Sequence, residues 1–434
     1  MNQNCTFSQT RTTHTYQQWA TCRTCFKNKE LGACVECLKT CHAGHDLGEI
    51  TYGNFFCDCG AKGLCDLNSR MKKLEETYSS LRQPIRSNNL LAVKLFNLME
   101  PENGTVYSPL SIFTILGMLQ HASVGNTFNQ IFGVFERLNT VNELMTISNV
   151  FNNTTVSKLS NVIVVNETKP ISKYYTDTMG DLAMIRNDDF SKPDVVARNI
   201  NSHIETNTNG MIKDLVKKEH IGMDTIMVLV NTIYFKSNWK YSFDKSSTFD
   251  DGFMNNAKGK TCKVPMMCGE ENDFNYFQDE IVEVVELPYN DNLFVMGFIL
   301  PKGKESQTCN YLGQPIPFAK QKIIVRIPKF TQRKNTDLVP VLKDLGASDM
   351  FDRNLANFPI VPTGAYVSVM IHEAVIIVDE AGTEASGATM ALLSEKCLRR
   401  SFPKIFNANH TFGYYIKHIS TGAFVFVGEY HGDD

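Results

Sequence analysis

The sequence predicts an α+β fold in which a large strand-rich domain follows a small cysteine-rich module. Nine of the 13 cysteines fall within the first 65 residues, so the two parts differ in composition. Apolar runs of strand length recur along the rest of the chain, at 161–165, 226–235, 292–300, 322–327, 367–378 and 423–428. Apolar residues with helical spacing occur at 90–99 and again up to Leu119. Several strands together with several helices indicate the α+β class.

Composition and charge limit the classes of function that the chain can have. The 434 residues are 43% hydrophobic and 21% charged, with a net charge of -3, which gives no reason to expect binding to nucleic acid or to an anionic membrane. Residues 1–20 lack the apolar core of a signal peptide, and no run approaches the roughly 18 apolar residues of a membrane helix. We therefore expect an intracellular protein, and the sequence does not specify its compartment.

The cysteines near the amino terminus are spaced as zinc ligands. Pairs occur at 22 and 25, at 34 and 37, and at 57 and 59, and two histidines stand at 42 and 45. A spacing of two residues lets paired thiolates or imidazoles reach one tetrahedral ion, and a module with so little aliphatic content needs metal to be stable. Disulfides are the alternative, but they do not explain the histidine pair and are typical of secreted proteins.

A polar and charged segment separates the two parts. Residues 68–88 include Pro84 and the Ser79-Ser80 pair, and the helical apolar spacing begins only at Leu90. Such a change in composition is typical of a domain boundary. The predicted organisation is therefore a zinc-binding module at 1–67, a linker at 68–88 and a large domain at 89–434.

The ligand order and the phrase Phe55-Phe56-Cys57-Asp58-Cys59-Gly60 resemble the UBR box, a multi-zinc module that in several ubiquitin ligases binds destabilising amino termini. The resemblance implies three structural zinc ions and makes Asp58 a possible peptide-binding residue. Asn28 and Ala61 stand where degron-binding members place further acids, so a protein amino terminus or a ubiquitin-pathway partner is expected to bind weakly. The implied zinc ligands are Cys5, Cys22, Cys25, Cys34, Cys37, His42, His45, Cys57, Cys59 and Cys65, with Cys41 as an additional candidate.

Residues 89–430 resemble the serpins, a family of suicide inhibitors of serine proteases. The phrases that carry the resemblance occur in the family's order, at 107–112, 231–240, 264–267, 285–289, 299–302, 327–330 and 372–389. They imply the serpin fold, which has a large central β-sheet, helices and an exposed reactive loop. They also imply a polar cluster under the main sheet that controls its opening, formed by Ser108, Ser111, Asn231 and His372. Gly104 stands where the family usually has an asparagine of this cluster.

The segment 379–389 resembles the hinge of the serpin reactive loop. In a strand, Thr383, Ala385, Gly387 and Thr389 would share one face, and small residues on that face suit a loop that later becomes a central strand. The resemblance implies that cleavage of the loop is followed by insertion of the hinge into the main sheet, so that the protein inhibits a protease and is not an enzyme. The predicted hinge residues are Glu380, Gly382, Thr383, Ala385, Ser386, Gly387, Ala388 and Thr389.

The bait bond, which the protease attacks, is predicted at one of two places. Counting sixteen residues forward from Glu380, as in inhibitory serpins, gives Lys396 and Cys397. Counting back from the strand near Phe412, as in a serpin with a short loop, gives Arg400 and Ser401. Both bonds follow a basic residue, which favours a trypsin-like protease or a subtilisin-like convertase. We prefer the first bond, because the second leaves four extra loop residues, roughly 13 Å of slack.

Two other functions remain open. The protein could have a serpin fold without inhibition and act as a binding protein, but members of that kind commonly carry bulky, charged or proline residues in the hinge. Thr383 and the small residues at 385–388 argue against this alternative. It could instead be an adaptor that captures a ubiquitin-pathway partner through its zinc module. Asn28 and Ala61 weaken that alternative.

Overall fold

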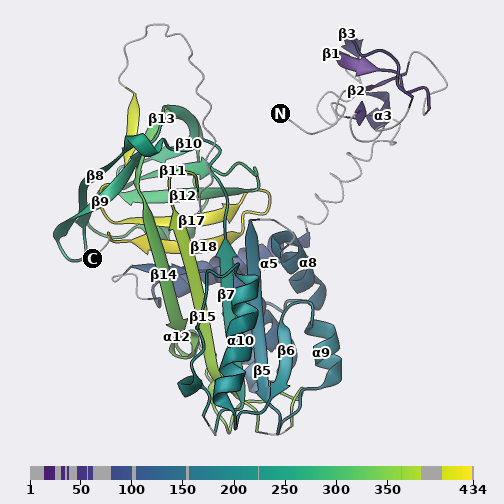
Figure 1. Cartoon of the computed structure of the whole chain (residues 1–434), viewed down its shortest axis with the longest axis vertical. Helices are drawn as coiled ribbons and strands as arrows, with labels where there is room; N and C mark the ends of the chain where they lie inside the picture. Colours follow the sequence, from purple (N-terminus) through teal and green to yellow (C-terminus); the bar gives the residue numbers. More distant parts are fainter. Residues whose placement is uncertain are drawn as a thin grey trace. The chain divides into compact units, whose positions relative to one another are not determined.

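The computed structural model divides the chain into two compact units, Met1–Ser80 and Leu81–Asp434, which are described separately (Figure 1). Five predicted zinc ligands, the hinge from Thr383 onward and both candidate bait bonds lie outside the residues that the structure describes. The described residues are 14–24, 31–34, 37–38, 46–55, 57–61, 80–99, 104–152, 156–222, 224–362, 364–382 and 403–432.

The described part of the amino-terminal unit is a small antiparallel sheet followed by one helical turn. Its strands are β1 (Thr15–Ala20), β2 (Ala33–Cys34) and β3 (Thr51–Phe55), in the order β2-β1-β3, and α3 (Asp58–Ala61) follows. Cysteine side chains make up most of its buried core, with Trp19 packed against them. A core of this composition contains little aliphatic surface, which agrees with the predicted need for metal.

The main sheet of the second unit contains five strands among the described residues. Their order is β14 (Phe330–Asp337), β15 (Val367–Val378), β7 (Met227–Phe235), β5 (Ser157–Asn166) and β6 (Met184–Asp188). The central pair, β15 and β7, is parallel, whereas β14 is antiparallel to β15. Every residue of β7 is buried, because both faces of the sheet are covered.

Helices cover the two faces of this sheet. On one face α6 (Pro109–Ala122) contacts β7 and β5, and α8 (Val141–Asn152) contacts β5. On the other face α10 (Pro193–Asn207) lies over β5, in front of the sheet in Figure 1. Pro109 begins α6, where its missing N–H is not needed, and Ser108 caps the helix by accepting a hydrogen bond from the Ser111 backbone.

A second, longer sheet continues the hydrophobic core. It runs β4 (Thr105–Tyr107), β18 (Phe424–Tyr430), β17 (Phe412–His418), β12 (Phe294–Pro301), β11 (Val282–Pro288), β10 (Asn272–Gln278), β13 (Ala319–Pro328), β9 (Lys260–Cys268) and β8 (Thr248–Asn255). The short strand β16 (Lys404–Asn407), which follows the predicted reactive loop in the sequence, pairs with β13 in parallel. The predicted α+β class is confirmed.

The remaining helices are α5 (Arg82–Phe96), α7 (Gly125–Phe135), α9 (Lys173–Met179), α11 (Thr308–Leu312) and α12 (Leu338–Asp344). Helix α5 includes residues 82–88, for which the sequence predicts a linker. Ile85 is buried there, but Pro84 and the polar Ser87 and Asn88 are buried beside it, so burial in this turn leaves no run of apolar residues in the sequence. No helix in the described ranges is long and apolar enough to cross a membrane.

Candidate functional site

The residues predicted to control opening of the sheet come together beneath its central strand pair. We call Ser108, Ser111, Asn231 and His372 the opening cluster. His372 on β15 lies opposite Asn231 on β7, and its Nδ1 is 2.7 Å from Asn231 Oδ1. The backbone N–H of Ser108 donates to His372 Nε2 at 3.0 Å. These two bonds fit a neutral imidazole that carries its proton on Nδ1.

The side chain of Asn231 connects α6 to the sheet. Its amide nitrogen donates to the Ser111 carbonyl at 3.1 Å, and the Ser111 hydroxyl donates to its Oδ1. All members of the opening cluster are fully buried, so their polar atoms depend on one another for hydrogen bonds. Through these bonds β7, β15 and the start of α6 are held in one arrangement.

Asn161 on β5 is a further member that the sequence prediction missed. It lies opposite Asn231 and accepts a hydrogen bond of 2.5 Å from the Asn231 amide. Its own amide donates to the Leu182 carbonyl at 3.1 Å, and its side chain is buried. The sequence offered one signal for this role of Asn161, which is an amide side chain at the start of the apolar run 161–165. A buried amide needs hydrogen-bond partners, and a neighbouring strand can supply them.

Acid is expected to destabilise the large unit through His372. Burial lowers the pKa of His372 to about 3, and burial also lowers the pKa of His418 to about 4. An unfolded histidine titrates near pH 6.5, so below that value the unfolded chain binds more protons than the folded one. Each histidine then costs up to about 1.4 kcal/mol per pH unit until its folded pKa is reached.

This expectation is checked by urea unfolding at pH 7.5 and pH 5.0, together with NMR of the histidine rings. The unfolding midpoint should fall with pH, and the His372 ring signals should stay unchanged down to about pH 4.5, because its folded pKa is about 3. A ring titration with a midpoint near 6.5 would contradict the assigned neutral state.

The start of the predicted hinge is held by the segment that follows β7. We call residues 379–382 the hinge base. The backbone N–H of Trp239 donates to the Ala381 carbonyl at 2.8 Å, and its indole N–H donates to the Asp379 carbonyl at 2.9 Å. The indole ring is stacked on Tyr289, with 4.7 Å between the ring centroids. The hinge base is therefore bound to the end of β7 by backbone and ring contacts.

Glu380 adds an ion pair to the hinge base. Its side chain is 7% exposed, and its carboxylate accepts hydrogen bonds from Lys329 Nζ at 2.9 Å and Thr248 Oγ1 at 3.0 Å. Burial acts to raise the pKa of Glu380, but these partners outweigh burial and the pKa is lowered. The carboxylate therefore stays ionised at neutral pH and connects the hinge base to β8 and to the segment before β14.

Gly382 is the last described hinge residue, and its position requires glycine. Its φ is +145°, and it forms an antiparallel bridge with Asn238. A Cβ atom there would lie 2.3 Å from the carbonyl oxygen of Ser237 and 2.7 Å from the backbone nitrogen of Trp239. The absence of a side chain thus lets the hinge base approach the backbone that follows β7.

The amino-terminal unit brings three predicted zinc ligands together. The sulfur atoms of Cys34, Cys37 and Cys57 all lie within 4.8 Å of one another, and those of Cys37 and Cys57 are 3.7 Å apart. Tetrahedral zinc with Zn–S bonds of about 2.3 Å places its sulfurs roughly 3.8 Å apart, whereas a disulfide needs about 2.05 Å. The residues fit zinc. Cys22 and Cys59 are also buried in this core but do not belong to this group.

Asp58 is engaged within its own module. Its carboxylate, 7% exposed, accepts a hydrogen bond of 2.9 Å from the Gly32 backbone N–H. Its backbone N–H in turn donates to the Gly32 carbonyl at 3.1 Å. The side chain thus fixes the segment before β2 against α3. This structural bond is a sufficient reason for an acidic residue at position 58, whether or not a peptide binds there.

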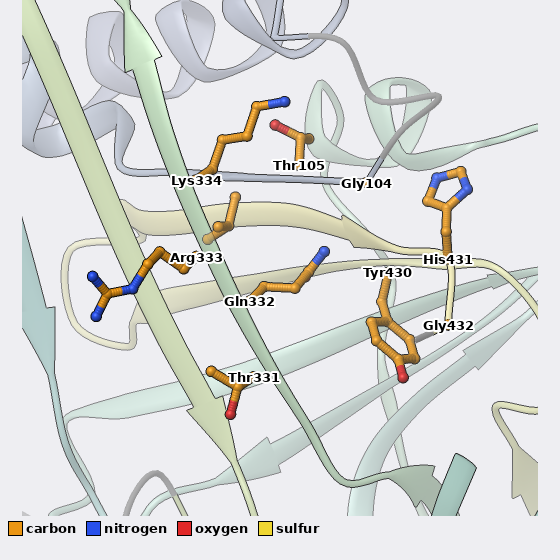
Figure 2. A pocket seen from close by; sticks show the side chains of 10 residues that line it. Gly104, Thr105, Thr331, Gln332, Arg333, Lys334, Tyr430, His431 and Gly432 are labelled. Atoms are coloured by element: carbon orange, nitrogen blue, oxygen red, sulfur yellow. The ribbon is translucent and has the colours of Figure 1, made fainter. Parts of the chain in front are cut away.

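Gly104, which stands where serpins usually have an asparagine, lies beside a cavity of about 330 Å³. Figure 2 shows Thr105, Gln332, Lys334 and His431 around this space, where β14 meets β4 and the end of β18. Gly104 has a φ of +76°, and a side chain there would meet Gln332 and His431. The Cβ of any other residue at this position would therefore contact β14 and the carboxyl-terminal segment.

Comparison with known proteins identifies the family. The model of the family described as "Serpin (serine protease inhibitor)" matches residues 86–431. This chain belongs to the serpin family. The model described as "Putative zinc finger in N-recognin (UBR box)" matches residues 4–73. Both resemblances found in the sequence, the serpin fold and the UBR-type zinc finger, are thereby confirmed.

Several relatives cover most of the serpin domain. An uncharacterized serpin-like protein of Acanthamoeba polyphaga mimivirus is 32% identical, over 83% of this chain and 93% of its own. Glia-derived nexin of Homo sapiens is 32% identical, over 78% of this chain and 90% of its own. The crystal structure of native protease nexin-1 with heparin matches with a TM-score of 0.72 and 27% identity, over 82% of this chain and 100% of that chain.

In the serpin domain the four members of the opening cluster meet one another. Glu380 and Gly382 lie in a separate place, at the hinge base, and the rest of the predicted hinge lies outside the described residues. In the zinc finger, Cys34, Cys37 and Cys57 meet, whereas Cys5, Cys25, His42, His45 and Cys65 are not described. Besides Asn161, the sequence prediction missed Lys329, Thr248 and Trp239, which hold the hinge base. The signal for the last of these was a tryptophan inside the family phrase 231–240.

Proposed function

We propose that this serpin is a suicide inhibitor of a serine protease that cleaves after basic residues. The observation that carries the proposal is the parallel pairing of β15 and β7 at the centre of the main sheet, directly before the hinge. A chain that turns back after β15 runs antiparallel to both strands. It can therefore form regular ladders with each of them once they separate. The small side chains predicted for one face of the hinge suit such a central position.

The reaction begins as ordinary proteolysis and stops at the acyl-enzyme. The protease nucleophile attacks the carbonyl carbon of the bait residue, the peptide bond breaks, and the amino group of the next residue leaves. The freed hinge inserts between β7 and β15, which adds hydrogen bonds and carries the esterified protease away from the loop's original position. Distortion of the protease then prevents water from completing hydrolysis. One inhibitor is consumed for each protease.

The bait residue sets the target. Lys396 followed by Cys397 is the preferred bond, and Arg400 followed by Ser401 is the alternative. A basic side chain pairs with a carboxylate at the bottom of a specificity pocket, so trypsin-like proteases and subtilisin-like convertases are the expected partners.

Incubation with trypsin tests this function. We expect a serpin–trypsin complex that survives denaturing electrophoresis, and mass spectrometry should place the new carboxyl end at Lys396. The Lys396→Ala variant should lose about 90% or more of the complex, because the pocket carboxylate loses its partner, whereas Arg400→Ala should retain it. Loss with Arg400→Ala alone would move the bait to the second bond. Clean cleavage that leaves trypsin fully active would favour the non-inhibitory binding protein.

We further propose that the zinc finger holds three structural zinc ions. The cluster of Cys34, Cys37 and Cys57 supports one of them, and the family's ligand pattern supplies the others. A thiol-rich zinc module suits a reducing compartment, which supports action inside the cell. Metal analysis should give about three zinc ions per chain, and Cys57→Ser should lower this number and unfold the module without unfolding the serpin domain. An unchanged zinc content in this variant would refute the assigned cluster.

The zinc finger is expected to bind protein amino termini weakly. The carboxylate of Asp58 accepts a bond from its own module, and Asn28 and Ala61 supply no further charge. The adaptor function therefore remains the second candidate. It would gain support if peptides with a basic amino-terminal residue bound to the isolated chain in a way that Asp58→Asn abolishes.

A further inference from the structure

A strap of residues 208–222 crosses the main sheet where the loop would insert. This strap follows α10, and its buried side chains are Ile212, Leu215, Val216 and Ile221. They belong to one apolar cluster with Val228 and Val230 of β7 and with Ile371 and Val375 of β15. The strap therefore shares one apolar cluster with both strands of the central pair, on the face opposite the opening cluster.

Polar bonds hold the strap to α10. Asn201 donates its side-chain amide to the Val216 carbonyl at 2.8 Å and accepts from the Val216 backbone N–H at 2.8 Å. Lys213 forms an ion pair of 2.8 Å with Glu205. Because α10 contacts β5, these bonds join the strap to the half of the sheet that contains β5 and β7.

Arg333 joins the same strap to the other half. It lies on β14, and its Nη2 donates to the Met211 carbonyl at 2.6 Å. Its Nη1 donates to Glu373 on β15 at 2.9 Å, and the Glu373 side chain is 5% exposed. The guanidinium of Arg333 thus connects its own strand, β14, to Glu373 on β15 and to Met211 of the strap. Its planar shape suits two acceptors at once.

Insertion of a strand must strain these connections. Neighbouring strands are about 4.8 Å apart, so an added strand roughly doubles the distance between β7 and β15. When the β5–β7 half of the sheet moves away from the β14–β15 half, a strap bound to both must lose its bonds to one of them. The single Arg333–Met211 bond, partly open to solvent, is weaker than the several bonds to α10 taken together and is the one expected to break first.

We propose that Arg333 is a positioning residue that limits the rate at which the main sheet admits the inserting loop, by tying the strap to the β14–β15 half. The inference rests on the proposed inhibitory function, since it concerns the step by which the hinge enters the sheet. Breaking this tie precedes separation of β7 and β15. The residue acts on the strap and touches neither the protease nor the bait.

The test measures how fast the full-length protein takes up a fluorescent synthetic peptide with the sequence of residues 383–396. Removal of Arg333 alone would leave a buried Glu373 carboxylate unpaired, so the informative pair is Glu373→Gln against Glu373→Gln with Arg333→Thr. The glutamine keeps an acceptor for Arg333, and the threonine is too short to reach Met211. Lys334→Thr, on the opposite face of β14, is the matched control for lost charge.

The double variant is expected to take up the peptide about fivefold faster than Glu373→Gln, the effect of one partly exposed hydrogen bond from a charged donor. Glu373→Gln and Lys334→Thr should stay close to the wild type. Equal rates in the two Glu373 variants, or the same acceleration with Lys334→Thr, would overturn the role of Arg333. So would a lower urea unfolding midpoint with an unchanged uptake rate, which a purely structural role predicts. A wild-type protein that takes up no peptide would instead contradict the proposed insertion itself, and the role of Arg333 with it.

Discussion

Gly382→Ala is expected to detach the hinge base from the end of β7 and to destabilise the serpin domain by about 3 kcal/mol or more. The new Cβ would lie 2.3 Å from Ser237 O, 2.4 Å from Asn238 Cα and 2.7 Å from Trp239 N. All three are backbone atoms, so no rotamer change relieves the overlap. The φ of +145° adds strain for any residue with a side chain.

The loss reaches beyond the glycine because its neighbours share the same contacts. Moving the hinge base away would break the bond from Trp239 to Ala381 and the bond from the Phe243 N–H to the Glu380 carbonyl, which is 2.8 Å long. It would also separate Glu380 from Lys329. The freed hinge should enter the main sheet of its own or of another molecule more readily, so native electrophoresis should detect oligomers.

Urea unfolding measures the stability loss, and Gly259→Ala is the matched control. Gly259 also has a positive φ, +62°, but a Cβ there would meet nothing within 4 Å. Its substitution therefore reports backbone strain alone, which costs about 1 kcal/mol. Equal losses in the two variants would show that the approach of the hinge base to the backbone of residues 237–239 contributes nothing.

Asn231→Ala is expected to cost about 4 kcal/mol, because it leaves several fully buried partners without a hydrogen bond. Within the described residues, the side chain bonds to the Ser111 hydroxyl and carbonyl, to Asn161 and to His372. An alanine satisfies none of them, and the site has no contact with bulk water. The variant should also take up the loop peptide faster, since β7 and β15 lose the bond between Asn231 and His372.

The measurement is again the urea midpoint, with Asn335→Ala as the control. Asn335 is exposed on β14, so its loss should stay within about 0.5 kcal/mol. A cost below about 1 kcal/mol for Asn231→Ala would mean that water replaces the missing amide, and the opening cluster would then contribute little to sheet closure.

Strands buried on both faces could be predicted closely from the sequence. The expected runs 226–235 and 367–378 correspond to β7 (Met227–Phe235) and β15 (Val367–Val378), because full burial produces a continuous apolar run. β14 was not predicted. It lies at the edge of the main sheet, and most of its residues are partly or fully exposed, so they are polar and produce no apolar run.

The candidate site was predictable only where its residues belong to a recognisable sequence pattern. The opening cluster could be located because its members sit inside recognisable family phrases. The bonds from Glu380 to Lys329 and Thr248 could not be predicted, since these residues are 51 and 132 positions away and no sequence pattern marks them as partners of Glu380. The same holds for Arg333, whose bond to Met211 depends on how the strap lies across the sheet.

The stacking of Trp239 on Tyr289 provides the protein with an internal optical reporter. The chain has two tryptophans, Trp19 in the zinc finger and Trp239 at the hinge base. The indole of Trp239 is 4% exposed and bonded to the Asp379 carbonyl, so release of the hinge base changes the polarity around it. With Trp19 replaced by phenylalanine, the remaining tryptophan emission would come from the hinge base, where the proposed mechanism has the loop enter the sheet. The emission wavelength could then be followed in real time after a protease is added, without attaching any dye.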